Sequence, residues 1–398
     1  MAPPFHTDHV GSLIRPQRLL DARAEAAKDP SSSEARSRVK TEEENAIKEV
    51  VSTQISKGVV PITSGEFERD IFYGGIFEKL SGFESTFKDW SQHRPGLPTA
   101  TRLQQFGLKG REAPVATAKV GHEKGVYLDD WLFLRSLLPE DKWSQAKMTI
   151  PSPVWIYVQL RDGEEYTTGV YESDAAFLAD VSAAFRKEIL VLYEHGLRFV
   201  QVDDPNLTYF CDVSFIEASE NENTDLNTVL QQCIKAHNDM IRDLPEDLHI
   251  GIHLCRGNMT QGQYFASGGY ERIAAELFNS LNYRLFYLEF DSPRAGDFTP
   301  LRRLPVGKAV VLGIATTKHA ELEDEDELRD RVHRAADVIA EGQARGREDV
   351  LSDTLAVSPQ CGFASSSGNK GVGFAVETQW QKLELLKNLA SRIWPSAR

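Results

Sequence analysis

Short apolar runs alternate with longer amphipathic stretches over the C-terminal three-fifths of the chain. Continuous apolar runs of this length are typical of strands buried on both faces, as in a parallel sheet. We therefore predict six parallel strands in this part of the chain. They are 154-VWIYV-158, 198-RFVQV-202, 248-LHIGIHL-254, 285-LFYLEF-290, 309-AVVLGIA-315 and 353-DTLAVS-358.

The stretches between these runs predict helices. Residues 174–195 carry apolar side chains at helical spacing. Residues 322–345 begin with acidic and end with basic side chains, which suits the dipole of a helix. We also predict a polar helix over 32–57, a closing amphipathic helix over 379–394, and a loop or helix cap at serines 31–33.

Two N-terminal segments complete the pattern. We predict strands within 5-FHTDHVGS-12 and 58-GVVPITSGEF-67, which gives eight βα units. Alternating strands and helices indicate an α/β fold with parallel pairing, and eight units favour a closed (β/α)₈ TIM barrel. A doubly wound open sheet is the alternative.

One interval, residues 70–148, interrupts this rhythm. It is rich in aromatic residues and too long for a structureless loop in a compact domain. We interpret it as an insertion after the second strand, with a hairpin over 103–120 and a helix near 128–137, on the active-site face of the barrel. No linker separates a second domain, so residues 1–398 are interpreted as one barrel domain.

Composition excludes several classes of partner. The 45 basic and 59 acidic side chains give a net charge of −14, which disfavours nucleic-acid and anionic-membrane binding. We find no apolar run of ~18 residues and no secretory signal pattern at the N-terminus. Four cysteines are too few for a disulfide framework, so we expect a reducing, cytoplasmic compartment.

The sharpest chemical signal is 253-HLC-255. On a strand, this spacing puts His253 and Cys255 on the same face, where an imidazole and a thiolate supply half of a soft-metal site. Ordinary packing is the more common explanation for such a pair when it stands alone. Cys361 and Glu289 lie at comparable strand ends, and the four residues together make a tetrahedral zinc site plausible. An arginine could equally satisfy a buried Glu289, and Cys211 and Cys233 are interpreted as structural.

Carboxylates form a second group at strand ends. Glu66 and Asp203 suit binding of an ammonium group or general-base chemistry. Asp204 precedes Pro205, and shaping of the loop weighs equally with function there.

A third group follows the first predicted strand. Gly11 and Ser12 offer backbone N–H groups to a ligand carboxylate or phosphate, and Arg15 could add a fork of donors.

These elements, in this order, resemble the C-terminal catalytic barrel of the cobalamin-independent methionine synthase family, as a short, single-barrel member. The resemblance spans residues 9 to 363. Its segments are 9-HVGSLIRP-16, 64-SGEFERD-70, 151-PSPV-154, 200-VQVDDP-205, 253-HLC-255, 287-YLEFDS-292, 311-VLGIATTK-318 and 358-SPQCGF-363.

The resemblance implies alkyl transfer to a thiol. It implies a catalytic zinc held by His253, Cys255, Glu289 and Cys361, with Glu289 the ligand that an incoming thiol would displace. It further implies that Glu66 and Asp203 hold the amino group of homocysteine. The backbone of Gly11 and Ser12 would then receive its carboxylate.

Three departures from the family pattern concern the second substrate. Asp204 replaces a glutamate, and Lys318 stands near the place of a histidine that helps to protonate the folate leaving group. Gly-Phe-Ala-Ser-Ser follows Cys361 in place of a segment rich in lysine and arginine. Together with the acidic net charge, this disfavours a polyglutamylated folate as the donor.

Three hypotheses follow. The first is a zinc-dependent methyltransferase that takes methyltetrahydrofolate, a methylated corrinoid protein or a small methyl-onium compound as donor. The second is a zinc enzyme of the same superfamily that adds a thiol to an epoxide or breaks a carbon–sulfur bond. The third is a non-catalytic zinc barrel that serves as a binding or regulatory protein.

Overall fold

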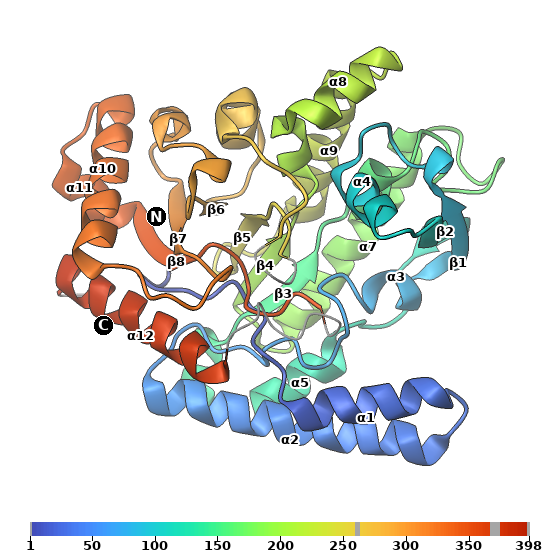
Figure 1. The fold of residues 1–398 in the computed structure, drawn as a ribbon, viewed down its shortest axis with the longest axis horizontal. Coiled ribbons are helices and arrows are strands. Elements are labelled where there is room, and N and C mark those ends of the chain that lie inside the picture. The colour runs from blue at the N-terminus through green and yellow to red at the C-terminus, as the bar shows by residue number, and fades with distance from the viewer. Residues whose placement is uncertain (1, 259–262, 367–374, 396–398) are drawn as a thin grey trace.

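A six-stranded parallel sheet forms the centre of the protein (Figure 1). The computed structural model describes residues 2–258, 263–366 and 375–395. The strands pair in chain order, each with the next. All are buried, apart from two half-buried residues at the start of β5. They are β3 (Met148–Pro151), β4 (Phe199–Asp203), β5 (His249–Leu254), β6 (Leu285–Glu289), β7 (Ala309–Ala315) and β8 (Leu355–Pro359).

The two N-terminal segments close this sheet into a ring. Thr7 pairs in parallel with Val357 of β8, and Ile62 pairs in parallel with Ala146 just before β3. A hydrogen bond of 2.8 Å between His9 Nε2 and the carbonyl oxygen of Pro61 joins the two segments to each other. The (β/α)₈ prediction is therefore confirmed, but both segments are single bridges rather than strands. Pro61 has no N–H to donate, which shortens the ladder there.

The prediction for the third strand is wrong. Residues 154–158 lie mostly in the short helix α6 (Trp155–Gln159), and the strand is the preceding segment Met148–Pro151. A short apolar run buried on every side has no periodicity that separates strand from helix. Pro151 and Pro153 end the ladder because neither residue has a backbone N–H group to donate.

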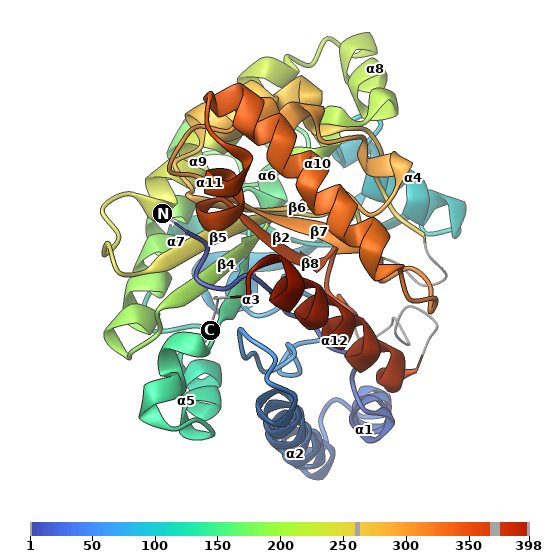
Figure 2. The same ribbon diagram turned by 90° about the vertical axis from the view of Figure 1, so that its left-hand side faces the viewer.

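Helices surround the barrel (Figure 2). Ser32 caps the second helix by accepting a hydrogen bond from the backbone of Ala35, as the serine cluster predicted. The four predicted helices are confirmed within about three residues at each end; they are α2 (Ser33–Lys57), α7 (Asp174–Glu194), α10 (Glu325–Gln343) and α12 (Val376–Ile393). The others around the barrel are α1 (Gln17–Lys28), α8 (Val213–Asn221), α9 (Leu226–Ile241) and α11 (Arg347–Asp353). None of the helices described is long and apolar enough to cross a membrane.

The insertion contains an antiparallel pair, β1 (Ser81–Asp89) and β2 (Gly110–Gly121), across the molecule from α10 and α11 (Figure 1). The predicted hairpin over 103–120 is wrong in its first strand, because residues 98–105 form the helix α4 (Pro98–Gln105). The helix predicted near 128–137 is confirmed as α5 (Leu128–Ser136), and a one-turn helix, α3 (Ile76–Lys79), precedes β1. Phe77 and Trp131 of the insertion share one hydrophobic cluster with barrel residues such as Val202.

Candidate metal and substrate site

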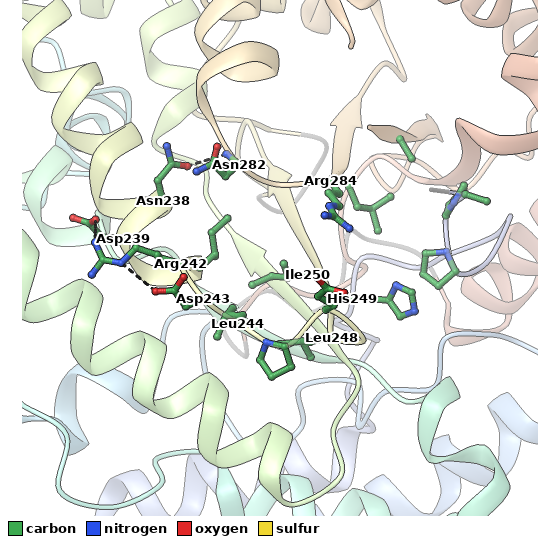
Figure 3. Close-up of a pocket in the computed structure, with 18 residues that line it drawn as sticks. Asn238, Asp239, Arg242, Asp243, Leu244, Leu248, His249, Ile250, Asn282 and Arg284 are labelled. Atoms are coloured by element: carbon green, nitrogen blue, oxygen red, sulfur yellow. Dashed lines mark hydrogen bonds and ion pairs between the residues drawn. The ribbon is translucent and has the colours of Figure 1, made fainter. Parts of the chain in front are cut away.

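Two cavities lie at opposite ends of the barrel. The larger, of about 480 Å³, meets the first residues of β5, β6 and β7. His249 and Ile250 of β5 lie in its wall (Figure 3). The smaller, of about 190 Å³, meets the C-terminal ends of the strands and includes Asp203, His253 and Cys361. Active sites of (β/α)₈ enzymes lie at the C-terminal ends of the strands, so the smaller cavity is the candidate site.

Three soft donor groups meet in the wall of this cavity. The donor atoms of His253, Cys255 and Cys361 all lie within 4.8 Å of one another, and the two Sγ atoms are 3.2 Å apart. His253 is buried, and its ring nitrogens have no hydrogen-bond partner among the described residues apart from the contact with the Cys255 thiol. An imidazole held only against thiols has the donor chemistry of a metal site. This group could hold a metal ion.

The neighbouring thiol disfavours ionisation of Cys255. The Cys361 thiol, and next burial, raise the pKa of the Cys255 thiol well above its ordinary value. Two thiolates so close together are stable only beside a compensating positive charge, which a divalent ion supplies. The electrostatics of the pair therefore agree with the metal-binding interpretation.

Glu289 is buried near these donors but does not join them. One carboxylate oxygen, Oε2, pairs with the guanidinium of Arg294 at 3.1 Å and lies 3.6 Å from that of Arg256. The other, Oε1, accepts a hydrogen bond from the backbone N–H of Arg256 at 3.3 Å. Arginine side chains thus satisfy the buried carboxylate of Glu289, as one of the two alternatives predicted. The role of Glu289 as a fourth metal ligand stays a prediction.

Asp203 and Glu66 both line the cavity, as the strand-end pattern predicted, but their surroundings differ. Glu66 Oε2 lies 3.0 Å from the guanidinium of Arg69, and Oε1 accepts a hydrogen bond from Thr149 Oγ1 at 2.8 Å. Asp203 has no ion-pair partner in the described part of the chain. Burial and next Glu66 raise the pKa of Asp203 to about 6. Asp203 thus has no cation paired with it in the described structure, and a cationic ligand group would stabilise its ionised form.

The turn after the first barrel segment packs tightly against Glu66. A Cβ atom on Gly11, which has φ +144°, would lie 2.8 Å from Glu66 Oε1 and 2.6 Å from Thr149 Cγ2. Glycine is therefore required here for the backbone to approach Glu66. Ser12 lines the cavity, and its Oγ accepts a hydrogen bond from the N–H of Ala364 at 3.3 Å.

Arg15 lies outside the cavity wall. Its Nη1 donates to the carbonyl of Ala364, and its Nη2 donates to the carbonyls of Glu66 and Arg69. These bonds tie the loops around the site together. Arg15 therefore acts on the backbone rather than as a fork of donors for a ligand.

Asp204 points away from the cavity, into a closed polar cluster. Its Oδ2 accepts hydrogen bonds from Ser152 Oγ at 2.6 Å and His237 Nε2 at 2.8 Å, and its Oδ1 accepts from the N–H of Leu207 at 2.8 Å. The residue is fully buried. These contacts correspond to the loop-shaping alternative, and they leave no oxygen for general-base chemistry on a ligand in the cavity.

Lys318 is also withdrawn from the cavity wall. Its Nζ donates to the carbonyls of Gly257 and Gln263 and to Asn258 Oδ1, at 2.7 to 3.1 Å. It holds the chain that follows Cys255 and does not face a leaving group in this arrangement. Cys211, on a 3₁₀ turn, and Cys233, inside α9, are buried away from the metal donors, as the structural interpretation predicted.

Aromatic side chains form one wall of the cavity, and the sequence pattern did not predict this part of the site. Trp155 and Tyr209 come from barrel loops and Phe72 from the insertion, and all three line the cavity together with Phe265. Phe72 meets Trp155 edge to face, with ring centroids 5.2 Å apart. The aromatic content of the insertion was the only available signal, and it did not say which ring faces the site. No lysine or arginine belongs to the described lining.

Comparisons with known proteins agree with this architecture. Residues 169–373 match the family model described as cobalamin-independent synthase, catalytic domain. The protein YxjG of Bacillus subtilis, described as uncharacterized, is 32% identical over 394 residues, which cover 98% of this chain and 95% of YxjG. A crystal structure of a putative vitamin-B12 independent methionine synthase from Listeria monocytogenes superposes with a TM-score of 0.71, at 26% identity and over 99% of both chains.

A more distant relative is a methyltransferase whose name gives its substrates. The 5-methyltetrahydropteroyltriglutamate–homocysteine methyltransferase of Corynebacterium glutamicum is 24% identical over 253 residues, which cover 64% of this chain and 30% of that enzyme. The match is thus to one part of a much longer protein. Taken with the family model and the YxjG match over nearly the whole chain, the barrel identifies this chain as a member of the cobalamin-independent synthase family, in a short, single-barrel form.

Proposed function

We propose that this chain is a zinc-dependent methyltransferase that transfers a methyl group to the sulfur of a homocysteine-like thiol. The family is one of methyltransferases, which supports the reaction class. The observation that carries the proposal is the cluster of the buried imidazole of His253 with the thiols of Cys255 and Cys361, in the wall of the cavity at the C-terminal ends of the barrel strands.

In this proposal His253, Cys255 and Cys361 hold the zinc. Zinc bound there would supply a Lewis acid that keeps a substrate thiol ionised at neutral pH. Glu289 remains the candidate for a fourth, exchangeable ligand. Arg294 and Arg256 hold its carboxylate in the arrangement described, and this would leave a coordination position for the thiol.

The acceptor would lie between the metal donors and the acids. Asp203, at the end of β4, is next to His253 in the sheet register and has no cation of its own in the described structure. It would bind the amino group of the acceptor, with Glu66 beside it held by Arg69. Ser12 lines the same cavity, where its backbone would receive the carboxylate.

The donor would contact the aromatic wall. A wall of Phe72, Trp155 and Tyr209 without a described cation suits an uncharged or cationic methyl donor better than a polyanion. A small methyl-onium compound or a folate with few glutamates fits this description. The relatives support small-molecule substrates and give no support to a corrinoid-protein donor.

The same wall favours one alternative function. An apolar cavity beside a zinc-bound thiolate would also suit a thiol alkyltransferase or carbon–sulfur bond enzyme that acts on an apolar electrophile. Formation of methionine from homocysteine would decide against this alternative. Inactivity with every methyl donor, together with thiol addition to an epoxide, would decide for it.

Zinc analysis followed by a methylation assay tests the proposal. We expect about one zinc per purified chain, its loss in Cys361→Ser, and its retention in the matched control Cys211→Ser, because Cys211 lies outside the donor cluster. The zinc-loaded protein is then given homocysteine with methyltetrahydrofolate or a sulfonium donor, and methionine is measured. Unchanged zinc in Cys361→Ser would refute the metal assignment.

A further inference from the structure

A chain of buried polar side chains lies behind Asp203, and none of the roles above explains it. Gln201 precedes Asp203 by two residues on β4, so both side chains lie on the same face of the strand. Gln201 Nε2 donates to Asp203 Oδ1 and to the carbonyl of Val10, each at 2.6 Å. Gln201 Oε1 accepts from Lys147 Nζ at 2.7 Å. One amide thus links an ammonium group to the candidate ligand carboxylate.

The chemistry of these neighbours permits only one orientation of the amide. The ammonium of Lys147 can only donate, whereas an ionised Asp203 and the carbonyl of Val10 can only accept. If the amide were rotated by 180°, its NH₂ group would face the ammonium, and its oxygen would face two acceptors. Lys147 therefore determines that Gln201 presents its NH₂ group to Asp203.

Lys147 is itself fixed. It donates to Asp8 Oδ1 at 2.5 Å and to the carbonyl of His9 at 3.2 Å, so all three of its protons are used. Tyr287 donates to the other oxygen of Asp8 at 2.6 Å. Each of these side chains is at most 6% exposed. The ammonium is paired with Asp8, and it orients Gln201 without neutralising Asp203.

We infer that Lys147 and Gln201 are positioning residues, which hold Oδ1 of Asp203 toward the barrel interior so that Oδ2 faces the acceptor's ammonium group. The inference rests on the proposed function, since it takes Asp203 as the site for that group. Oδ2 of Asp203 has no hydrogen-bond partner among the described residues, and Asp203 lines the cavity. A carboxylate held by one oxygen loses little further freedom when the other binds a ligand.

The experiment compares two thiols on matched variants of the zinc-loaded protein. Homocysteine carries the amino group, and 4-sulfanylbutanoate is the same chain without it. Gln201→Met removes the amide at similar volume, and Gln201→Asn keeps an amide that is one methylene too short to reach both partners. The control is Gln54→Met, because Gln54 is equally buried but bonds to backbone groups of Val50 and Thr63 and to His9, and not to Asp203.

We expect both Gln201 variants to raise KM for homocysteine by about 10- to 100-fold with kcat within about threefold, as loss of a charge-assisted contact predicts. The KM for 4-sulfanylbutanoate should stay within about twofold, and the control should change neither value. Circular dichroism and zinc content show whether each variant is folded and loaded.

Other outcomes separate the inference from the proposed function. An equal rise for both thiols, or no rise for homocysteine, overturns the positioning role while methyl transfer stands. If the wild-type protein uses both thiols equally well, Asp203 does not bind the amino group, and the inference fails with it. If the wild-type protein methylates neither thiol and binds neither, the proposed function is wrong and the inference falls as well.

Discussion

At the scale of single residues, the structure separates carboxylates that looked alike in the sequence. Asp203 and Asp204 are adjacent, yet one lines the cavity and the other is sealed behind β4 against Ser152 and His237. Glu66 has its own guanidinium in Arg69, whereas Asp203 has none in the described structure. The side-chain alternation of a strand explains the difference between neighbours, because successive residues point to opposite faces.

The role of Glu289 can be tested directly. Glu289→Gln removes the charge between Arg294 and Arg256, so we expect the free energy of unfolding of the metal-free protein to fall by about 3 kcal/mol in urea titrations. We expect zinc affinity to fall far less than in Cys361→Ser, since Glu289 does not join the three donors. Equal losses of zinc in the two variants would instead establish Glu289 as a ligand.

We expect the carboxyl group of Glu68 to make the free energy of unfolding depend on pH. Burial, and next Asp130, raise the pKa of Glu68 from 4.5 to about 7. Between these values the folded protein keeps a proton that the unfolded chain has lost, so this group makes the protein less stable as pH rises through that window. Glu68→Gln should therefore gain about 1–3 kcal/mol at about pH 8 and almost nothing at about pH 4.5.

Urea unfolding at the two pH values measures this effect. The matched control is Glu123→Gln, because Glu123 is exposed and should show no such difference. Stabilisation of Glu68→Gln by the same amount at both pH values would contradict the assignment.

At the scale of elements, one buried carboxylate fastens the insertion to the barrel. Glu188, inside α7, pairs with His122 Nε2 at 2.6 Å and accepts hydrogen bonds from the N–H groups of Val126 and Tyr127 at 2.8 Å. These partners follow β2 directly. The position of the hairpin therefore depends in part on a contact between segments about 60 residues apart.

Glu188→Met should release this attachment. We expect a loss of about 3 kcal/mol in unfolding free energy, because two N–H groups and an imidazole lose a fully buried partner. Amide hydrogen exchange should rise first over residues 110–127. Glu194→Met, at the exposed end of the same helix, should change stability by less than about 0.5 kcal/mol. Uniform exchange across the barrel would argue against a local role.

At the scale of the whole molecule, barrel closure brings together residues that are far apart in the sequence. Cys255 and Cys361 are 106 positions apart, yet their sulfur atoms are 3.2 Å from each other. Each follows a strand of one parallel sheet, and the C-terminal ends of such strands meet on one face. A metal ion bound there would link the chain after β5 to the chain after β8.

Metal removal should therefore weaken the entire fold. We expect a chelator to lower the Tm of the zinc-loaded protein by about 5 °C or more, and added zinc to restore it, because a ligand of the folded state stabilises by mass action. Cys361→Ser should show a lower Tm that the chelator leaves unchanged. Differential scanning calorimetry measures all three values, and an unchanged wild-type Tm would contradict the proposed site.

The sequence by itself determined the fold class, the four longest helices, and the three donors His253, Cys255 and Cys361 that the structure brings together. Those features depend on local information: apolar periodicity, capping serines, and a histidine and cysteines at strand ends. It misplaced the strand at 148–151 and the first arm of the hairpin, because a run buried on every side, or one mostly exposed, has no usable period.

Only the tertiary structure decided which side chains are free to bind a ligand. Arg15, Asp204 and Lys318 have suitable chemistry, but each is already bonded to groups from distant segments. Trp155 and Phe72 have unremarkable sequence contexts, but they form one cavity wall. Whether a polar group is satisfied depends on its neighbours in space, and barrel closure selects those neighbours from the whole length of the chain.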